Sequence, residues 1–237
     1  MTILALETSS KAASCALAKD GLVIGEAYVN AGLTHSQTIM PMVADMLLNA
    51  AAALADTDVF AVSAGPGSFT GLRIAIAAVK GMAMALNRPC AAVSTLHGLA
   101  VNAQIHKGLI APVLDARRDQ VYTALFRSDG QSIKRLADDE ALSLDDLQAR
   151  LSGADAPVLL VGDGATLCME RLKGIDNMGK APEHMLYQRA SSVCAVAADL
   201  ARSGKLVGAD ALSPVYIRLP QAERELAAKR AADEGAR

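Results

Sequence analysis

One pattern occurs twice along the chain and limits the folds that it can adopt. In each half a short apolar run ends at an acidic residue, and an Asp-Gly pair follows. Glu7 precedes Asp20 by 13 residues, and Asp115 precedes Asp129 by 14. Apolar runs of this length are typical of buried strands, and Asp-Gly is a strong hairpin signal. A repeat this long predicts two similar lobes rather than a solenoid. A generic α/β sheet with chance Asp-Gly pairs is the alternative.

Residues 1–107 are predicted to form the N-terminal lobe. The expected strands cover residues 3–6, 14–18, 22–28, 59–63 and 90–93. The expected helices run from Thr34 to about residue 53, over residues 72–86, and from Ser94 to about residue 106. Thr34 and Gln37 match a capping box, and Pro41 should kink or delay the first turn of its helix.

Residues 108–213 repeat the pattern and are predicted to form a C-terminal lobe. The expected strands cover residues 109–114, 120–126, 132–136 and 158–161, with a short helix that Ser143 caps and another helix after Gly164. Residues 214–237 are expected to form a helical tail that packs on the first lobe or reaches a partner. Each lobe therefore reads βββαβα. This α/β arrangement resembles the actin-like ATPase superfamily, whose lobes have the ribonuclease H-like fold and hold nucleotide between them.

Composition argues against direct binding to nucleic acid or membranes. The net charge is −2, aromatic residues make up 3% and Trp is absent. Such a chain offers neither a broad basic surface nor an aromatic platform for stacked bases. The N-terminus lacks a signal-peptide pattern, and charges interrupt the apolar stretches. A cytoplasmic protein is expected. The four cysteines form no CxxC pair and are expected to be reduced and buried.

Two loops could be degenerate nucleotide-binding loops. Glu7, Thr8 and Ser9 occupy the position of the superfamily's first phosphate loop, but no glycine follows until Gly21. Without glycine the backbone approaches a phosphate less closely. The alternative is that Glu7 and the hydroxyls satisfy backbone groups at a strand end.

The segment from Gly65 to Gly71 is the second of these loops, and Gly67 lies within it. It is neither a P-loop nor a dinucleotide fingerprint, although the helix that follows could face an anion. Arg73 lies in the first turn of that helix, where its charge opposes the helix dipole. This position suggests an outside carboxylate or phosphate; a solvated arginine is the equal alternative.

Small residues and methionines gather on two helices of the first half. Small residues four apart let another helix approach closely, and methionine adapts to irregular surfaces. One interpretation is a helix-on-helix interface with another chain, and the other is ordinary intramolecular core. The candidate interface residues are Met42, Met46, Ala77, Ala78, Gly81, Met82 and Ala85.

No metal or protease motif is present. The four histidines form no HExxH motif, and no GxSxG elbow supports a hydrolase triad.

Several segments together resemble the bacterial TsaB (YeaZ) family. They are residues 4–9, residues 34–37 with Pro41, residues 63–73 and residues 214–218. The resemblance spans nearly the whole chain. It implies a part in the formation of N6-threonylcarbamoyladenosine (t6A) at position 37 of tRNAs that read ANN codons.

The resemblance also implies partners. Family members pair with a paralogue, TsaD, through the helices of the N-terminal lobe, and an ATPase, TsaE, joins the complex. TsaD carries an HxxxH metal motif in the corresponding helix. This chain has His97 there, but the position four residues later is Val101 instead of a second histidine. A non-catalytic scaffold is therefore expected, with no cofactor or metal of its own and only degenerate nucleotide-binding loops. ATP and metal are expected in the partner subunits, tRNA contact only through the complex, and a homodimer when the partner is missing.

The competing hypothesis is an actin-like ATPase or kinase that uses its own cleft. Glu7 and Asp115 would then be the carboxylates on the metal side. The missing glycine after the first strand argues against it.

Overall fold

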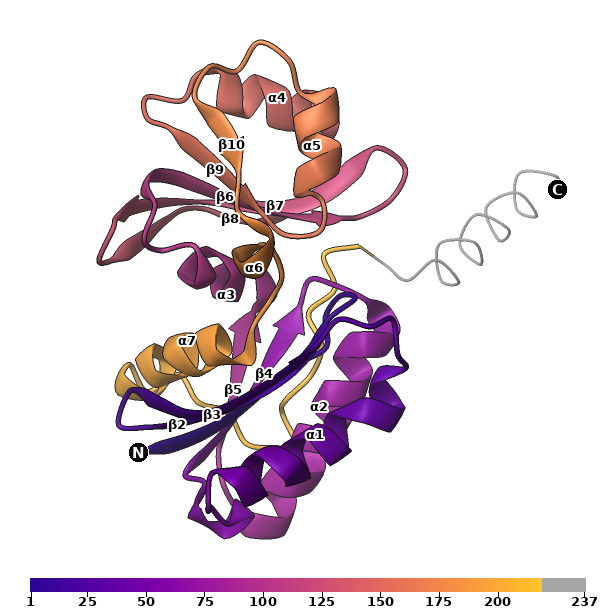
Figure 1. Cartoon of the computed structure of the whole chain (residues 1–237), viewed down its shortest axis with the longest axis vertical. Coiled ribbons are helices and arrows are strands. Elements are labelled where there is room, and N and C mark those ends of the chain that lie inside the picture. Colours follow the sequence, from indigo (N-terminus) through magenta and orange to yellow (C-terminus); the bar gives the residue numbers. More distant parts are fainter. Residues whose placement is uncertain (219–237) are drawn as a thin grey trace, which may run out of the picture.

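Two five-stranded mixed sheets with the same strand order form the frame of the molecule (Figure 1). The computed structural model describes residues 1–218 of the 237-residue chain. The first sheet has the order β3-β2-β1-β4-β5, and the second has the order β10-β9-β6-β7-β8. In each sheet the first strand lies in the centre, antiparallel to its hairpin neighbour and parallel to the strand on its other side. The predicted duplication is thus present in the topology.

The first lobe follows the predicted order of elements. Its elements are β1 (Thr2–Glu7), β2 (Ala13–Lys19), β3 (Leu22–Val29), α1 (His35–Asn49), a 3₁₀ turn (Leu54–Asp56), β4 (Val59–Gly65), α2 (Phe69–Leu86), β5 (Cys90–Ser94) and α3 (Thr95–Asn102). Alternate residues of β1 face opposite sides of the sheet. Leu4 and Leu6 pack beneath α1 and α2, while Ile3 and Ala5 belong to a separate cluster on the other face.

The second lobe has shorter helices. Its elements are β6 (Lys107–Asp115), β7 (Gln120–Asp129), β8 (Ile133–Ser143), α4 (Leu144–Ser152), β9 (Val158–Val161), α5 (Ala165–Arg171), β10 (Met178–Lys180) and α6 (Glu183–Leu186). β8 is longer than residues 132–136 because its pairing with β7 continues to Ser143. β10 and α6 were not predicted.

The chain then returns to the first lobe, which corrects the predicted boundary at residue 213. Helix α7 (Ala190–Arg202), which was not predicted either, covers the face of the first sheet opposite α1 and α2 (Figure 1). Its Val193 and Ala197 pack with Ile3 and Ala5. Beyond α7, Val207 bridges to Cys90, and the N–H of Val215 donates to Ala64 O at 2.7 Å.

Helix ends differ from prediction in a few places. α1 ends at Asn49, α2 begins earlier, at Phe69, and α3 ends at Asn102. His106 therefore lies outside the helix on which it was placed. Thr34 is the N-cap of α1, but its side chain makes no capping hydrogen bond, so the predicted capping box is wrong.

Ser94 and Ser143 do cap α3 and α4. Each hydroxyl accepts a hydrogen bond from the backbone N–H three residues later, which satisfies one of the free donors at the helix start.

The cysteines agree with the prediction, whereas the described part of the tail does not. All four cysteines are buried and free, as expected. Burial raises the pKa of the Cys168 and Cys194 thiols to about 12, so both stay protonated at neutral pH. Residues 214–218 contain no helix. The rest of the predicted helical tail, residues 219–237, lies outside the described residues.

Candidate functional site

The loop after β1 packs directly on the glycine loop that follows β4. The backbone N–H of Ser68 donates to Ser9 O at 2.6 Å, and Thr8 Oγ1 donates to Gly71 O at 2.7 Å. A Cβ at Gly67 would lie 2.5 Å from Ser9 O, and one at Gly71 would lie 2.0 Å from Thr8 O. These two glycines therefore make room for the backbone of the chain itself.

Gly65 makes room for the C-terminal segment. Its φ is +133°, and a Cβ there would lie 2.2 Å from Val215 O. The segment of residues 214–218 thus runs against the glycine loop. Two segments far apart in the sequence, residues 63–73 and 214–218, are therefore in contact.

Glu7 is withdrawn from solvent. Its carboxylate accepts hydrogen bonds from the backbone N–H of Ser9, at 2.5 Å, and from Ser63 Oγ. Burial raises the pKa of Glu7 above its usual range. Gln188 accepts a hydrogen bond from Ser10 Oγ at 2.9 Å and closes the same region from the far end of the chain. This geometry matches the interpretation in which Glu7 satisfies groups at a strand end.

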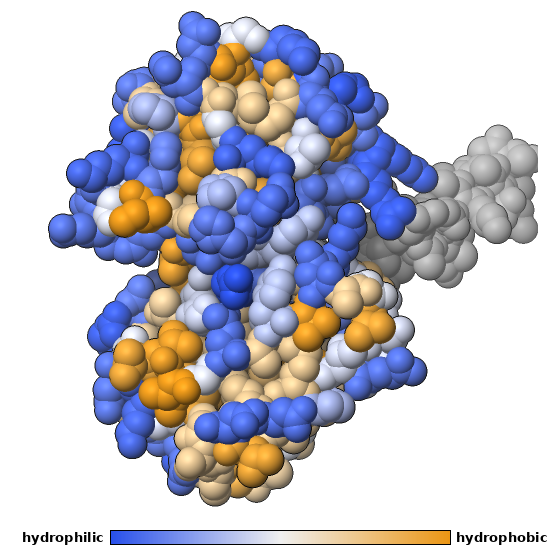
Figure 2. Space-filling view, viewed as in Figure 1, coloured by the Kyte–Doolittle hydropathy of each residue, from blue (hydrophilic) through white to orange (hydrophobic). Residues whose placement is uncertain are grey.

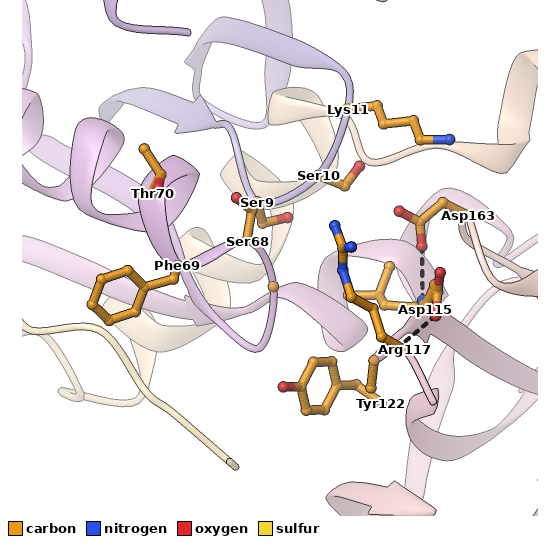
Figure 3. Close-up of a pocket in the computed structure, with 13 residues that line it drawn as sticks. Ser9, Ser10, Lys11, Ser68, Phe69, Thr70, Asp115, Arg117, Tyr122 and Asp163 are labelled. Carbon is orange, nitrogen blue, oxygen red and sulfur yellow. Dashed lines mark hydrogen bonds between the residues drawn. The ribbon is translucent and has the colours of Figure 1, made fainter. Parts of the chain in front are cut away.

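A polar cleft of about 490 Å³ lies between the two lobes (Figure 3). Ser9, Ser10 and Lys11 line it from the first lobe, and Arg117 and Asp163 line it from the second. Its other lining residues are Gly67, Ser68, Phe69, Thr70, Leu114, Asp115, Ala116 and Tyr122. Glu7 is not among them, so the structure contradicts its assignment as a metal-side carboxylate of an ATPase.

The acidic wall of the cleft is internally hydrogen-bonded. The N–H of Asp115 donates to Asp163 Oδ1 at 3.0 Å, and the N–H of Arg117 donates to Asp115 Oδ1 at 2.7 Å. Burial raises the pKa of Asp163. Sequence reasoning found Asp115, Ser9 and Gly67 but missed Lys11, Arg117 and Asp163. No local signal marks those residues, because the fold alone brings the two lobes together.

Two of the histidines, His97 and His35, contact neighbouring groups within the fold. His97 stacks on Phe126 with ring centroids 5.4 Å apart, and burial lowers its pKa. His35 Nε2 lies 2.8 Å from Ser10 O and ties the start of α1 to the β1 loop. Within residues 1–218, no group of three His, Cys, Asp or Glu side chains could hold a metal ion.

Helices α1 and α2 lie side by side on one face of the first sheet (Figure 1). Ala77, Gly81 and Ala85 are exposed on α2. Beyond its own helix, no atom in the described part of the chain lies within 4 Å of a Cβ built at Gly81. Figure 2 shows apolar colours gathered over this lobe, whereas the second lobe is largely hydrophilic.

Two methionines of these helices are buried, unlike the exposed small residues of α2. Met46 and Met82 are only 5% and 7% exposed and belong to the core of the first lobe. For these two, the intramolecular alternative is the correct one. Met42 and Ala78 are partly buried and pack against the same core. α2 is the one helix among the described residues that is long and apolar enough to cross a membrane, and seven of its 18 residues are buried against the lobe.

Comparison with known proteins agrees with this architecture. A family model described as TsaD, tRNA N6-adenosine threonylcarbamoyltransferase, matches residues 29–225. A Bacillus subtilis protein named tRNA threonylcarbamoyladenosine biosynthesis protein TsaB is 34% identical, and the match covers 94% of this chain and 96% of that protein. The Escherichia coli protein of the same name is 32% identical over 97% of this chain and 100% of its own length.

A solved structure shows the same fold. YeaZ from Pseudomonas aeruginosa superposes with a TM-score of 0.79 at 33% identity, and the match covers 91% of this chain and 99% of that chain. The fold is thus two tandem actin-like, ribonuclease H-like lobes. With relatives this similar over nearly their full length, the chain belongs to the TsaB (YeaZ) family.

Proposed function

We propose that this protein is a non-catalytic subunit needed for t6A formation in tRNA. In this proposal it docks on a TsaD-type threonylcarbamoyltransferase through the exposed face of α1 and α2 and activates it. The names of the relatives support a part in t6A biosynthesis, and the family model that matches the chain is that of the transferase itself.

One observation carries the proposal. The two loops in the position of the superfamily's phosphate loops pack against each other here, because the backbone of Ser9 and Thr8 lies against Gly67 and Gly71. Glycines that usually admit a ligand instead admit a neighbouring loop. A protein that has filled its own phosphate loop but keeps an exposed small-residue helix face is better suited to docking than to catalysis.

The fold suggests how docking works. A transferase of the same family carries helices equivalent to α1 and α2, so the two proteins can pair about a pseudo-twofold axis. Ala77, Gly81 and Ala85 let a partner helix approach closely. Without the transferase, the same face would cover itself in a homodimer.

The proposal also assigns tRNA, ATP and metal to other parts of the assembly. Its net charge of −2 favours tRNA contact through the complex rather than by this subunit alone. ATP and metal would then be held by the transferase and by a TsaE-type ATPase. We place the whole assembly in the cytoplasm.

Gly81→Leu tests the docking face. The leucine points into open space in the free protein, so folding should persist while the partner helix is blocked. We expect binding to the transferase from the same genome to weaken by about 100-fold, measured by calorimetry and co-elution. Ala149→Leu, an exposed site on α4 of the second lobe, is the matched control and should bind normally. Unchanged binding by Gly81→Leu would defeat the assignment.

The alternative is an ATPase with its own cleft, and the cleft does offer charged side chains. Lys11 and Arg117 could meet phosphates, and Asp115 and Asp163 could face a cation. Calorimetry of the isolated protein with Mg-ATP separates the two hypotheses. We expect no tight binding and no turnover. Micromolar binding with hydrolysis that Lys11→Ala removes would favour the ATPase.

A further inference from the structure

An exposed ridge of α2 begins with an aromatic and cationic cluster. Phe69, Arg73, Ala77, Gly81 and Ala85 are four residues apart along the helix, and all five are exposed. Residues at this spacing form one continuous ridge that can enter the groove of another helix. The small residues explain how close a partner can come, but they do not explain the arginine.

Arg73 is held in place by two aromatic rings. Its guanidinium carbon lies 3.8 Å from the centre of the Phe69 ring and 5.9 Å from that of Tyr216. Its Nε donates to the Tyr216 hydroxyl at 2.9 Å, and the two rings stack with centroids 5.2 Å apart. Tyr216 belongs to the C-terminal segment that runs along the glycine loop. Stacking and a hydrogen bond fix a side chain that would otherwise sample many rotamers.

The charge of Arg73 has no acidic partner within residues 1–218. Because α2 begins at Phe69, Arg73 is the fifth residue of the helix and lies just past its first turn. Because Nε is engaged by Tyr216, the two terminal nitrogens remain for an acceptor from outside. An arginine ordered before binding loses little entropy when it forms a bidentate pair.

We propose that Arg73 binds an Asp or Glu carboxylate of the transferase-type partner, and that Phe69 and Tyr216 position it. This inference rests on the proposed docking of α1 and α2, because the ridge that starts at Arg73 continues into that face. A protein carboxylate fits better than an RNA phosphate. The ridge continues as uncharged small residues, whereas RNA backbone contacts need a basic surface.

Four variants test the proposal against the intact transferase, with binding measured by calorimetry at two salt concentrations. Arg73→Glu should weaken binding by about 100-fold, because it places two like charges together. Arg73→Lys should lose about tenfold, because lysine cannot form the planar fork. Tyr216→Phe keeps the stacking but not the hydrogen bond and should lose about threefold. Arg88→Glu, an exposed site just beyond α2, is the matched control and should bind normally.

The outcomes are separable. Thermal melts first show that each variant is folded. Rescue of Arg73→Glu by a single Asp→Arg or Glu→Arg change in the transferase would support the pair directly. If Arg73→Glu binds normally while Gly81→Leu does not, this inference fails and the proposed function stands. If the wild-type chain does not bind the transferase, the proposed function itself fails. If Arg73→Glu loses only tRNA binding, the carboxylate partner is wrong.

Discussion

The two lobes share one strand order, yet their helices differ in length and character. In the first lobe α1 and α2 have 15 and 18 residues, and the exposed face of α2 includes Ala77, Gly81, Met84 and Ala85. The corresponding helices of the second lobe, α4 and α5, have 9 and 7 residues, and α4 carries charges at both ends. Duplication explains the common frame. In the proposed docking, only the first lobe presents such a helix face to the partner.

The loops of the two lobes differ as well. Glu7 at the end of β1 is buried, whereas Asp115 at the end of β6 is exposed and lines the cleft. Gly65 and Gly162 both have positive φ and both admit a backbone carbonyl, but the carbonyl comes from Val215 in one lobe and from Val113 in the other. The first lobe thus closes its glycine loop with a distant segment, and its acid is buried by hydrogen bonds to Ser9 and Ser63.

The largest effect is expected from Gly71→Ala. A methyl group there would lie 2.0 Å from Thr8 O, a backbone atom that cannot move without shifting β1. We expect a loss of about 2–4 kcal/mol in the free energy of unfolding, measured by urea titration. Gly162→Ala, with its contact at 2.2 Å, is the counterpart in the second lobe and should cost a similar amount. A tolerated Gly71→Ala would show that the first loop is not filled as described.

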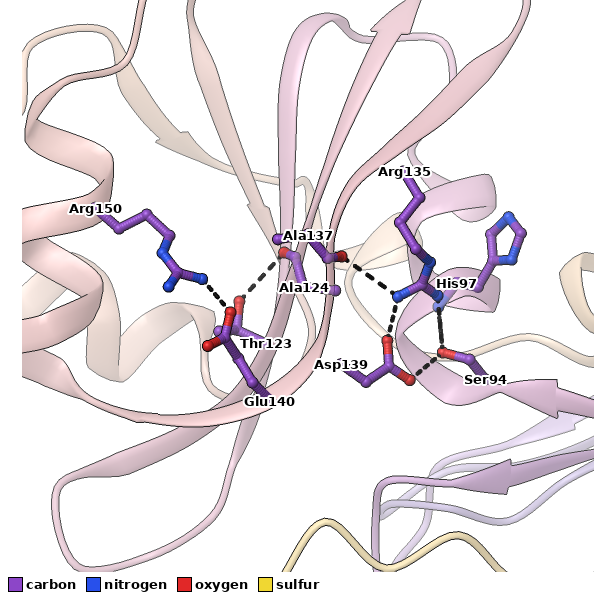
Figure 4. A network of polar contacts seen from close by, with 9 residues as sticks. All are labelled: Ser94, His97, Thr123, Ala124, Arg135, Ala137, Asp139, Glu140 and Arg150. Atoms are coloured by element: carbon purple, nitrogen blue, oxygen red, sulfur yellow. Dashed lines mark hydrogen bonds and ion pairs between the residues drawn. The ribbon is translucent and has the colours of Figure 1, made fainter.

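Arg135→Ala should have an intermediate effect, because Arg135 joins the lobes (Figure 4). It pairs with Asp139 at 2.5 Å, and the same carboxylate accepts a hydrogen bond from Ser94 at the end of β5. The guanidinium also lies 4.6 Å from the centre of the Phe126 ring. We expect a loss of about 1–2 kcal/mol by urea titration.

Arg127→Ala is the control for Arg135, because it breaks an exposed ion pair with Asp155. Such pairs contribute about 0–1 kcal/mol. Equal losses for the two variants would contradict a bridging role for Arg135.

Glu7→Gln tests the burial of the first acid through pH. Because the pKa of Glu7 is raised in the folded state, the folded protein holds this proton more tightly than the unfolded chain. The stabilisation that comes from this tighter proton binding is complete below the ordinary pKa of glutamate. It is lost as the pH rises through the raised pKa of Glu7. The stability of Glu7→Gln relative to wild type should therefore increase with pH across that window. Urea titrations from pH 4 to 8 check this. If the difference in unfolding free energy between Glu7→Gln and wild type did not change with pH, the raised pKa of Glu7 would be refuted.

Gly81→Ala should have the smallest effect, and of opposite sign. The methyl group meets open space, and alanine loses less backbone entropy than glycine in a helix. We expect a gain of about 0.5–1 kcal/mol in unfolding free energy, with binding to the transferase almost unchanged. A loss of stability would mean that the surroundings of Gly81 are not open.

Local patterns predicted the strands well, because each buried strand is a short apolar run bounded by a turn. They failed where distant segments meet. Nothing near Ala190 says that α7 crosses to the first sheet, and nothing near Lys11 says that Arg117 faces it across a cleft. The methionines show the limit most clearly. Met46 and Met82 fit an interface or a core equally well by composition, and only packing assigns them to the core.

Reconstituted tRNA modification tests the central claim most directly. The transferase, the TsaE-type ATPase, threonylcarbamoyl-adenylate and an ANN-decoding tRNA would be incubated with this protein, without it, or with Gly81→Leu in its place. We predict t6A only with the wild-type chain, and none from this chain without the transferase. Full modification in its absence, or t6A formed by this chain alone, would contradict the account.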